Sequence, residues 1–345
     1  MTGSTELPHE PVLTVEELQV GFSVGHRTIR AVNGVSFSVA PGETLAIVGE
    51  SGSGKSTTGL ALMGLIEKTK RIRISGRVRL KSKIGRVCDT LELPARTLRQ
   101  VRGNDIAMIF QEPMSSLNPV YSIGAQIAEA VALHRKMSRA DSLARALELL
   151  EQLGVPNPDK CLVSYPHQLS GGMRQRAMIA MALSCEPRLL IADEPTTALD
   201  VTVQAQIIEL LKQVQARTGM AIIFITHNLA IVSEIADRTL VMYAGEVVES
   251  VSAADLFDRP RMPYTAALLQ SLPRLDVDRP RAAKLAAIPG GVPNAGALPS
   301  GCRFHPRCGY FLGSTCDAAR PPLEPCAPGH WVRCHRWRDI GDFAA

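Results

Sequence analysis

The chain has 345 residues, of which 46% are hydrophobic and 21% charged, and its formal net charge is +5. These values are ordinary for a globular protein, and the length is enough for one large domain and a smaller one. No apolar run approaches the roughly 18 residues that a membrane-spanning helix needs, and the polar stretch Met1–Pro11 lacks the apolar core of a signal peptide. We therefore expect the protein to stay in the cytosol. The net charge is too small to indicate a nucleic-acid partner.

Short runs of alternating apolar residues at 12–20 and 35–39 predict strands joined by turns. Phe22 follows the first run, and a single aromatic residue in such a region packs into a core more often than it stacks on a ligand. Between Lys68 and Arg86, basic residues alternate with apolar ones on both sides of Ser75–Gly76. This pattern predicts a two-stranded ribbon with one solvated basic face, and contact with an anionic surface is the less favoured alternative.

A glycine-rich stretch, Gly49-Glu50-Ser51-Gly52-Ser53-Gly54-Lys55-Ser56-Thr57, lies between an apolar run at 44–48 and a helical pattern at 57–63. It fits the P-loop pattern G-x-x-x-x-G-K-[ST] in the strand, loop and helix context that the pattern requires. Its glycines let backbone N–H groups converge on one anion at the helix N-terminus. Lys55 is then expected to reach the outer phosphates and Ser56 to ligate magnesium. The motif predicts a nucleoside triphosphate site, and a plain Gly/Ser-rich turn is the disfavoured alternative.

Three further buried strands end in polar residues. The run from 106 ends at Gln111, the run from 188 ends at Asp193 and Glu194, and the run from 221 ends at His227. Successive strand residues face opposite sides, so the two adjacent carboxylates are expected to serve different roles, one toward magnesium and one toward the attacking water. Ligands bind at the carboxyl edge of an open α/β sheet, where the P-loop also lies.

Helices are predicted between these strands. Ser138 and Asp141 form a capping-box pattern at the start of a helix that Gly154 ends. The stretch Leu169-Ser170-Gly171-Gly172-Met173-Arg174-Gln175 leads into an apolar helix, and its Ser-Gly-Gly turn offers a second set of converging N–H groups. By itself, that turn is more simply interpreted as a capped helix start.

Taken together, these motifs resemble an ABC transporter ATPase. The Walker A motif (Gly49 to Ser56), the Q-loop glutamine Gln111, the signature from Leu169, the Walker B motif (Leu189 to Asp193), Glu194, the Asp200 loop and the His227 switch follow that family's order over residues 12–255. The resemblance implies an α/β P-loop NTPase (RecA-like) nucleotide-binding domain at 12–258. It also implies an antiparallel β subdomain and an α-helical subdomain at about 112–187 within this domain.

The same resemblance implies roles for single residues. Phe22 is expected to stack on adenine, against the core interpretation that pattern alone favours. Ser56 and Gln111 are expected to bind magnesium, which Asp193 supports through water, while Glu194 polarises the attacking water. In such ATPases two subunits enclose two ATP molecules, and the signature of one meets the nucleotide on the other. The implied catalytic residues are Lys55, Gln111, Glu194 and His227, and the implied nucleotide-binding residues are Phe22, Gly49, Ser51, Gly52, Ser53, Gly54, Lys55, Ser56, Thr57, Ser170, Gly171, Gly172, Gln175 and Asp200.

The C-terminal part, 259–345, is similar over most of residues 259–335 to the tails of ATPases from oligopeptide and dipeptide importers, through Arg259–Leu269, Ile288–Pro293, Gly301–Cys308, Cys316 and His330–Cys334. One departure is Met262, where that group usually has His. The similarity implies ATP-driven import of di- or oligopeptides at the cytoplasmic face of the inner membrane. The implied partners are a second ATPase subunit, expected to be a paralogue, two membrane permease subunits and an extracytoplasmic substrate-binding protein.

Other functions stay open beside this one. Importers of nickel or other peptide-like solutes carry related tails. A soluble ABC ATPase acting on nucleic acid or the ribosome is disfavoured, because such proteins usually carry two nucleotide-binding domains or a long coiled-coil insertion.

Four of the eight cysteines, Cys302, Cys308, Cys316 and Cys334, lie in one short tail. In a cytosolic protein such clustering favours a metal over disulfides. The intervals of five, seven and seventeen residues differ from the paired C-x-x-C of common zinc sites and suit a loop around a larger inorganic core. We expect a [4Fe-4S] cluster, which four thiolates can hold and which some peptide-importer ATPases carry in this tail. Zinc and disulfides remain alternatives, and Cys326 could replace Cys316 or Cys334.

Overall fold

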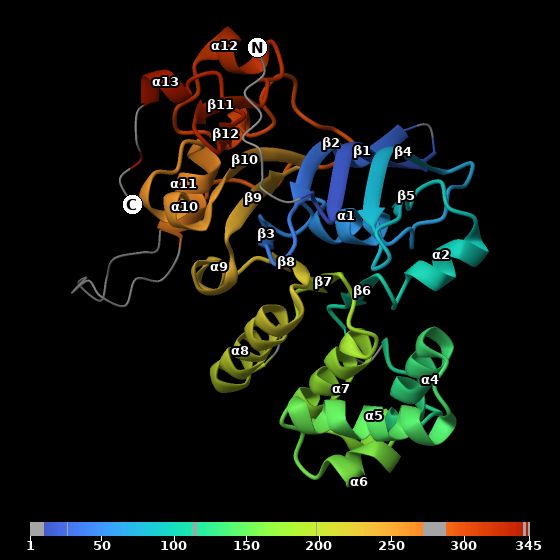
Figure 1. Ribbon diagram of the computed structural model, residues 1–345. Coiled ribbons are helices and arrows are strands. Elements are labelled where there is room, and N and C mark those ends of the chain that lie inside the picture. Colours follow the sequence, from blue (N-terminus) through green and yellow to red (C-terminus); the bar gives the residue numbers. More distant parts are fainter. Residues whose placement is uncertain are drawn as a thin grey trace, which may run out of the picture.

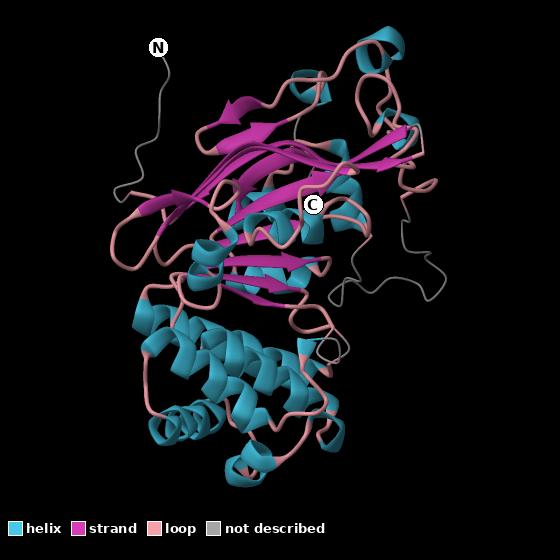
Figure 2. Ribbon diagram, turned by 90° about the vertical axis from the view of Figure 1, so that its right-hand side faces the viewer, coloured by secondary structure: helices cyan, strands magenta, loops and turns pink. Residues whose placement is uncertain are grey.

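The computed structural model describes residues 10–25, 27–112, 116–197, 199–271, 288–340 and 343. Most of the polar N-terminal stretch, on which the prediction about a signal peptide depends, lies outside these residues. Among the described helices, none is long and apolar enough to cross a lipid bilayer. Figures 1 and 2 show two sheets in the middle of the molecule, a group of helices at one end and the C-terminal region at the other.

The central sheet has eight strands in the order β11-β12-β10-β9-β3-β8-β7-β6. Its five consecutive strands from β9 to β6 run parallel, and each is almost entirely buried, because helices and the second sheet cover both faces. β10 and then β12 and β11 continue the sheet in antiparallel pairings. The bounds are β3 Thr44–Val48, β6 Ile106–Ile109, β7 Leu189–Asp193, β8 Ala221–Thr226, β9 Arg238–Tyr243, β10 Glu246–Ser252, β11 Glu324–Ala327 and β12 His330–Val332.

An antiparallel sheet of order β2-β1-β4-β5 packs over the central one, through a core that the two sheets share. The predicted two-stranded ribbon is wrong: Ser75–Gly76 lies inside one continuous strand, not in a turn. Gly76 has φ +104°, and an added Cβ would lie 2.6 Å from the Glu17 carbonyl oxygen, so a bulge between β1 and β4 requires this glycine. The bounds are β1 Leu13–Val24, β2 Arg27–Val39, β4 Ile72–Lys81 and β5 Val87–Asp89.

Helices α4 to α7 gather beyond β6 and β7, and the helical segment expected at about 112–187 encloses them (Figure 1). The helix predicted from Ser138 is α5: the Ser138 hydroxyl accepts a hydrogen bond from the Asp141 N–H at 3.2 Å. The helices are α1 Lys55–Leu62, α2 Ala95–Val101, α4 Ile123–Arg135, α5 Arg139–Gln152, α6 Pro158–Val163, α7 Gly171–Leu183, α8 Val201–Thr218, α9 Leu229–Ile235, α10 Ala253–Asp258, α11 Pro263–Gln270, α12 Gly313–Asp317 and α13 Trp337–Ile340.

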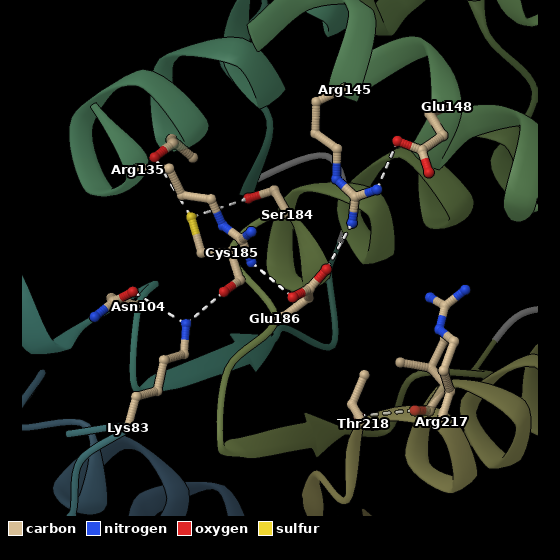
Figure 3. A network of polar contacts seen from close by, with 12 residues as sticks. Lys83, Asn104, Arg135, Arg145, Glu148, Ser184, Cys185, Glu186, Arg217 and Thr218 are labelled. Carbon is tan, nitrogen blue, oxygen red and sulfur yellow. Dashed lines mark hydrogen bonds and ion pairs between the residues drawn. The ribbon is translucent and has the colours of Figure 1, made fainter. Parts of the chain in front are cut away.

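A polar network joins this helical group to the sheet (Figure 3). Glu186, in the loop before β7, accepts from Arg135 of α4 at 2.9 Å and from Arg145 of α5 at 3.0 Å. In the same network, the Lys83 ammonium donates to the carbonyl oxygen of Cys185 and to the side chain of Asn104. The loop before β7 therefore carries contacts from both the helices and the segment after β4.

The C-terminal region does not fold apart from the rest of the chain. β12 pairs with β10, and one hydrophobic core contains Val48 of β3, Tyr243 of β9 and Tyr264 of α11 together with Phe304 and Val332. Residues on the two sides of the expected boundary at 258 thus share this core. The predicted P-loop α/β fold, with its antiparallel and helical parts, is confirmed, while the expectation of a loop-dominated tail missed the two strands that extend the sheet.

Candidate nucleotide site

The P-loop lies between β3 and α1 and requires glycine at both of its ends. Gly49 has φ +146°, and a Cβ there would lie 2.1 Å from the carbonyl oxygen of Met242. Gly54 has φ +101°, and a Cβ would lie 2.3 Å from the carbonyl oxygen of Ala31. Both neighbours are backbone atoms of adjacent strands, so no side chain fits at either position. The N-terminus of α1 then opens at the mouth of the loop.

Lys55 holds the loop in its curled form. Its ammonium donates to the carbonyl oxygens of Gly49 at 2.7 Å and of Glu50 at 3.0 Å. Burial lowers the pKa of Lys55, and the nearby charges of Glu194, Asp193 and Glu50 partly offset that effect. An anion entering the loop would meet this buried cation.

A cleft of about 140 Å³ brings together residues from three separate motifs. P-loop residues form one side, and the Q-loop glutamine and the acidic residue after β7 form the other. These are Ser51, Gly52, Gly54, Lys55, Ser56, Thr57, Gln111 and Glu194. The sequence predicted all eight for the nucleotide site.

The two adjacent carboxylates contact different partners, as their alternation along β7 predicts. Asp193 accepts a hydrogen bond from the Ser56 hydroxyl at 3.0 Å, and its burial raises its pKa despite that bond. Glu194 accepts from the Gln111 amide at 3.1 Å and from the Thr197 hydroxyl at 2.9 Å, and His227 Nδ1 lies 3.0 Å from its other oxygen.

Burial alone would raise the pKa of Glu194, but the hydrogen bonds from His227 and Thr197 and the electrostatic effects of His227 and Lys55 together outweigh burial, so this pKa lies below its ordinary value. Glu194 is therefore a carboxylate at neutral pH. Sequence reasoning missed Thr197, for which no motif offered a signal.

Two P-loop residues predicted for the site lie behind the cleft: Gly49 faces the β9 backbone, and Ser53 is buried with its carbonyl accepting from the Gly245 N–H at 2.9 Å. Phe22 lies on β1, partly buried against the core between the sheets, and is not among the residues that line the cleft. The structure therefore does not place Phe22 beside the phosphate-binding residues.

The signature residues and Asp200 lie at the starts of α7 and α8, not on the elements that form the cleft. Ser170 caps α7 by accepting from the Met173 N–H at 3.3 Å, and Gly171 and Gly172 form its first turn. Gln175 donates to the carbonyl oxygen of Pro195. Asp200 caps α8 by accepting from the Val203 N–H at 2.9 Å. Ser170 and Gly171 are exposed, and none of these residues lines the described cleft.

Sequence reasoning also assigned no role to Glu50, which is held by residues far along the chain. Its N–H donates to the Tyr264 hydroxyl at 2.9 Å, and its carboxylate accepts from both terminal nitrogens of Arg307, at 2.7 and 3.0 Å. Separations of 214 and 257 residues leave no local pattern that predicts these contacts.

The four clustered cysteines line one small cavity, together with Phe304, His305 and Tyr310 among others. Cys326 lies elsewhere, with its thiol donating to the carbonyl oxygen of His330. All eight cysteines are described and none forms a disulfide. Burial raises the pKa of Cys302 to about 11 and that of Cys334 to about 12. The described residues contain no group of three or more His, Cys, Asp or Glu side chains that could hold a metal ion, so this geometry does not itself support zinc or a cluster.

Comparisons with known proteins agree with the motifs. The family model "ABC transporter" matches residues 32–197, and the model "Oligopeptide/dipeptide transporter, C-terminal region" matches residues 248–316. A Brucella abortus protein named for peptide import is 50% identical over 338 residues, which cover 97% of this chain and 99% of that protein. The dipeptide transport ATP-binding protein DppD of Escherichia coli is 48% identical, with 94% and 96% covered. The oligopeptide transport ATP-binding protein AppD of Bacillus subtilis is 46% identical, with 96% and 98% covered.

Among solved structures, a dimeric ATP-binding cassette in a post-hydrolysis state with ADP and Pi matches with a TM-score of 0.63 and 27% identity, covering 70% of this chain and 98% of that one. The chain thus belongs to the ABC transporter ATPases, and to those among them that carry the oligopeptide/dipeptide transporter C-terminal region.

Proposed function

We propose that this chain is the ATP-hydrolysing subunit of a membrane importer for di- or oligopeptides. The observation that carries the proposal is similarity along nearly the whole chain, the C-terminal region included, to proteins named for dipeptide and oligopeptide transport. No observation favours nickel or another solute over peptides.

The cleft residues supply what phosphoryl transfer needs, which is positioning and charge neutralisation. Lys55 and the P-loop amides would hold the phosphates. The oxygens of Ser56, Gln111 and Asp193 suit magnesium, which prefers oxygen ligands and, when bound, neutralises phosphate charge. Glu194, kept ionised by its hydrogen bonds, would orient the attacking water, and His227 would stand at the γ-phosphate.

We further propose that two ATPase subunits close on the nucleotides, because Ser170 and Gly171 of the signature are exposed and do not line the cleft of their own chain. Val201, the first residue of α8 and next to Asp200, is 80% exposed, as an interface residue would be before assembly. A paralogous second subunit is the partner we propose. Solved cassettes of similar structure are dimers.

The permease contact would lie on the helical group. A groove of about 780 Å³ runs between α4, α5 and α6, and exposed Tyr121 and Val163 contribute to its lining. We propose that it receives a helix of a permease subunit, which places the chain at the cytoplasmic face of the inner membrane, with two permease subunits and an extracytoplasmic substrate-binding protein as further partners.

Uptake of radiolabelled dipeptides and of nickel by cells that lack this gene tests the proposed cargo. Dipeptide uptake should be lost and should return with the native gene but not with Glu194→Gln. Loss of nickel uptake with normal uptake of di- and oligopeptides would overturn the peptide assignment.

We propose in addition that Cys302, Cys308, Cys316 and Cys334 hold a [4Fe-4S] cluster. Support comes from the shared cavity that the four thiols line and from their capacity to supply four thiolates. The described residues contain no ready-made metal site for either zinc or a cluster, so the proposal rests on the shared cavity and on the number of thiols. Anaerobic purification followed by iron, sulfide and zinc analysis tests this proposal. A colourless protein with stoichiometric zinc and no sulfide would show that the site holds zinc and not a cluster.

A further inference from the structure

Each polar group of Glu50, which lies in the P-loop, forms a hydrogen bond or an ion pair with another residue. Its carbonyl oxygen accepts from Lys55 at 3.0 Å, its N–H donates to the Tyr264 hydroxyl at 2.9 Å, and its carboxylate receives both terminal nitrogens of Arg307. Two of these three partners, Tyr264 and Arg307, come from the C-terminal region. The P-loop is therefore held from outside the cassette motifs.

Contacts other than the one with Glu50 also hold the Arg307 side chain in place. Its Nε donates to the Pro289 carbonyl oxygen at 2.9 Å, and one terminal nitrogen lies 3.3 Å from the Tyr243 hydroxyl. The guanidinium lies 5.8 Å from the ring centre of Tyr243 and 6.0 Å from that of Phe304, and only 5% of the side chain is exposed. A guanidinium held this way presents a rigid two-point fork to one carboxylate.

A second contact from the same segment reaches the P-loop indirectly. Arg303 donates to the carbonyl oxygen of Ala244 and pairs with Glu246 at 2.9 Å, at the turn between β9 and β10. The N–H of Gly245 in this turn donates to the carbonyl oxygen of Ser53 at 2.9 Å. Residues 303–307 thus hold the P-loop at Glu50 and support the turn that holds it at Ser53.

We propose that Arg307 is a positioning residue for nucleotide binding: by fixing and neutralising Glu50, it makes the ATP affinity of the P-loop depend on the C-terminal region. The inference rests on the proposed assignment of the P-loop as the nucleotide site. Without Arg307, an unpaired carboxylate would stand in the loop that takes phosphates, and one of the fixed points of the loop would be lost.

The test measures binding of a fluorescent ATP analogue to the purified full-length chain, with a thermal melt of each variant. Arg307→Gln should weaken binding about tenfold, as expected when a charge-assisted pair beside the binding loop is lost. Arg307→Lys keeps the charge without the fork and should weaken binding about threefold. In a Glu50→Gln background, both changes should alter affinity less than about twofold, because their partner is already gone.

Arg338→Gln is the matched control, because it removes a surface ion pair with Glu324 in the same C-terminal region and should leave affinity unchanged. Unchanged affinity in Arg307→Gln, or a loss of equal size with and without Glu50, would overturn the proposal. If Arg307→Gln melts far below the native chain, Arg307→Lys carries the same comparison. Lys55→Ala distinguishes failure of the Arg307 proposal from failure of the nucleotide-site assignment. If Lys55→Ala also leaves binding unchanged, the P-loop is not the nucleotide site; if it abolishes binding while Arg307→Gln does not change it, only the role of Arg307 is wrong.

Discussion

The imidazole Nδ1 of His227 lies 3.0 Å from a carboxylate oxygen of Glu194, although 33 positions separate the two residues. The parallel pairing of β7 with β8 places their carboxyl ends side by side, and the Glu194 N–H donates to the Ile225 carbonyl oxygen at 2.8 Å. Glu194 also has a left-handed backbone, with φ +47°, a strained conformation for this residue. The sheet therefore fixes the carboxylate against the histidine before any ligand arrives.

Glu194→Gln should reduce ATP turnover by at least about a hundredfold while ATP still binds, because the amide keeps the shape but loses the basic oxygen. The measurement is phosphate release by the purified importer together with nucleotide affinity. Hydrolysis at the native rate would show that Glu194 does not act on the attacking water.

Thr197→Val should move the acid limb of the ATPase pH profile to higher pH. The Thr197 hydroxyl donates to Glu194 at 2.9 Å and helps to lower the pKa of that carboxylate, so without it Glu194 takes up a proton at higher pH. Thr218→Val makes the same chemical change at the far end of α8, where the hydroxyl donates to the Val214 carbonyl oxygen, and should leave the profile in place. A profile that also stays in place in Thr197→Val would contradict the assigned role.

The sequence predicts those parts of the site that follow from local pattern. Buried runs of five or six residues identify β3, β7 and β8, and polar residues directly after them fall at one sheet edge because parallel strands share their direction. Glu194 follows β7 in this way, Gln111 follows the short strand β6, and the P-loop pattern after β3 identifies Lys55; the structure brings these three residues to one cleft.

Other features depend on tertiary packing that no local pattern encodes. Ser75–Gly76 has turn composition, yet pairing with β1 places it inside a strand, opposite a bulge in β1. The ion pair between Arg307 and Glu50 joins residues 257 positions apart. The strand β12 has only three residues, and its conformation depends on its pairing with β10. In these cases the partner, not the segment itself, decides the conformation.

Phe22→Ala should weaken ATP affinity about fivefold if the ring stacks on adenine, since such stacking is worth of order 1 kcal/mol. Phe22 also packs against the core between the sheets, so Phe22→Leu serves as the control that keeps most of the apolar bulk. If the native chain, Phe22→Leu and Phe22→Ala bind ATP with equal affinity, Phe22 only packs in the core and does not stack on adenine.

Gly171→Asp should abolish hydrolysis in the assembled importer without lowering the melting temperature of the isolated chain. A Cβ added at Gly171 meets no atom of the described residues within 4 Å, so the side chain has room until a partner's nucleotide closes on it. Binding of ATP to the isolated chain should be unchanged, because Gly171 does not line its own cleft. A large drop in melting temperature would mean that the position matters to the fold, and full activity would argue against the two-subunit site.

Cys334→Ser should lower the iron bound after anaerobic purification to less than about half and should lower the melting temperature, because a cluster that lost one of four thiolates would be held weakly. Cys326→Ser is the matched control: Cys326 lies outside the cavity, and a serine hydroxyl can still donate to the His330 carbonyl oxygen. Iron and sulfide should therefore be retained in this variant. The same metal content in both variants, or a greater loss in Cys326→Ser, would show that the four-cysteine assignment is wrong. If the native chain is purified anaerobically and contains no iron, the chain holds no cluster, and the four thiols only pack against one another in the cavity.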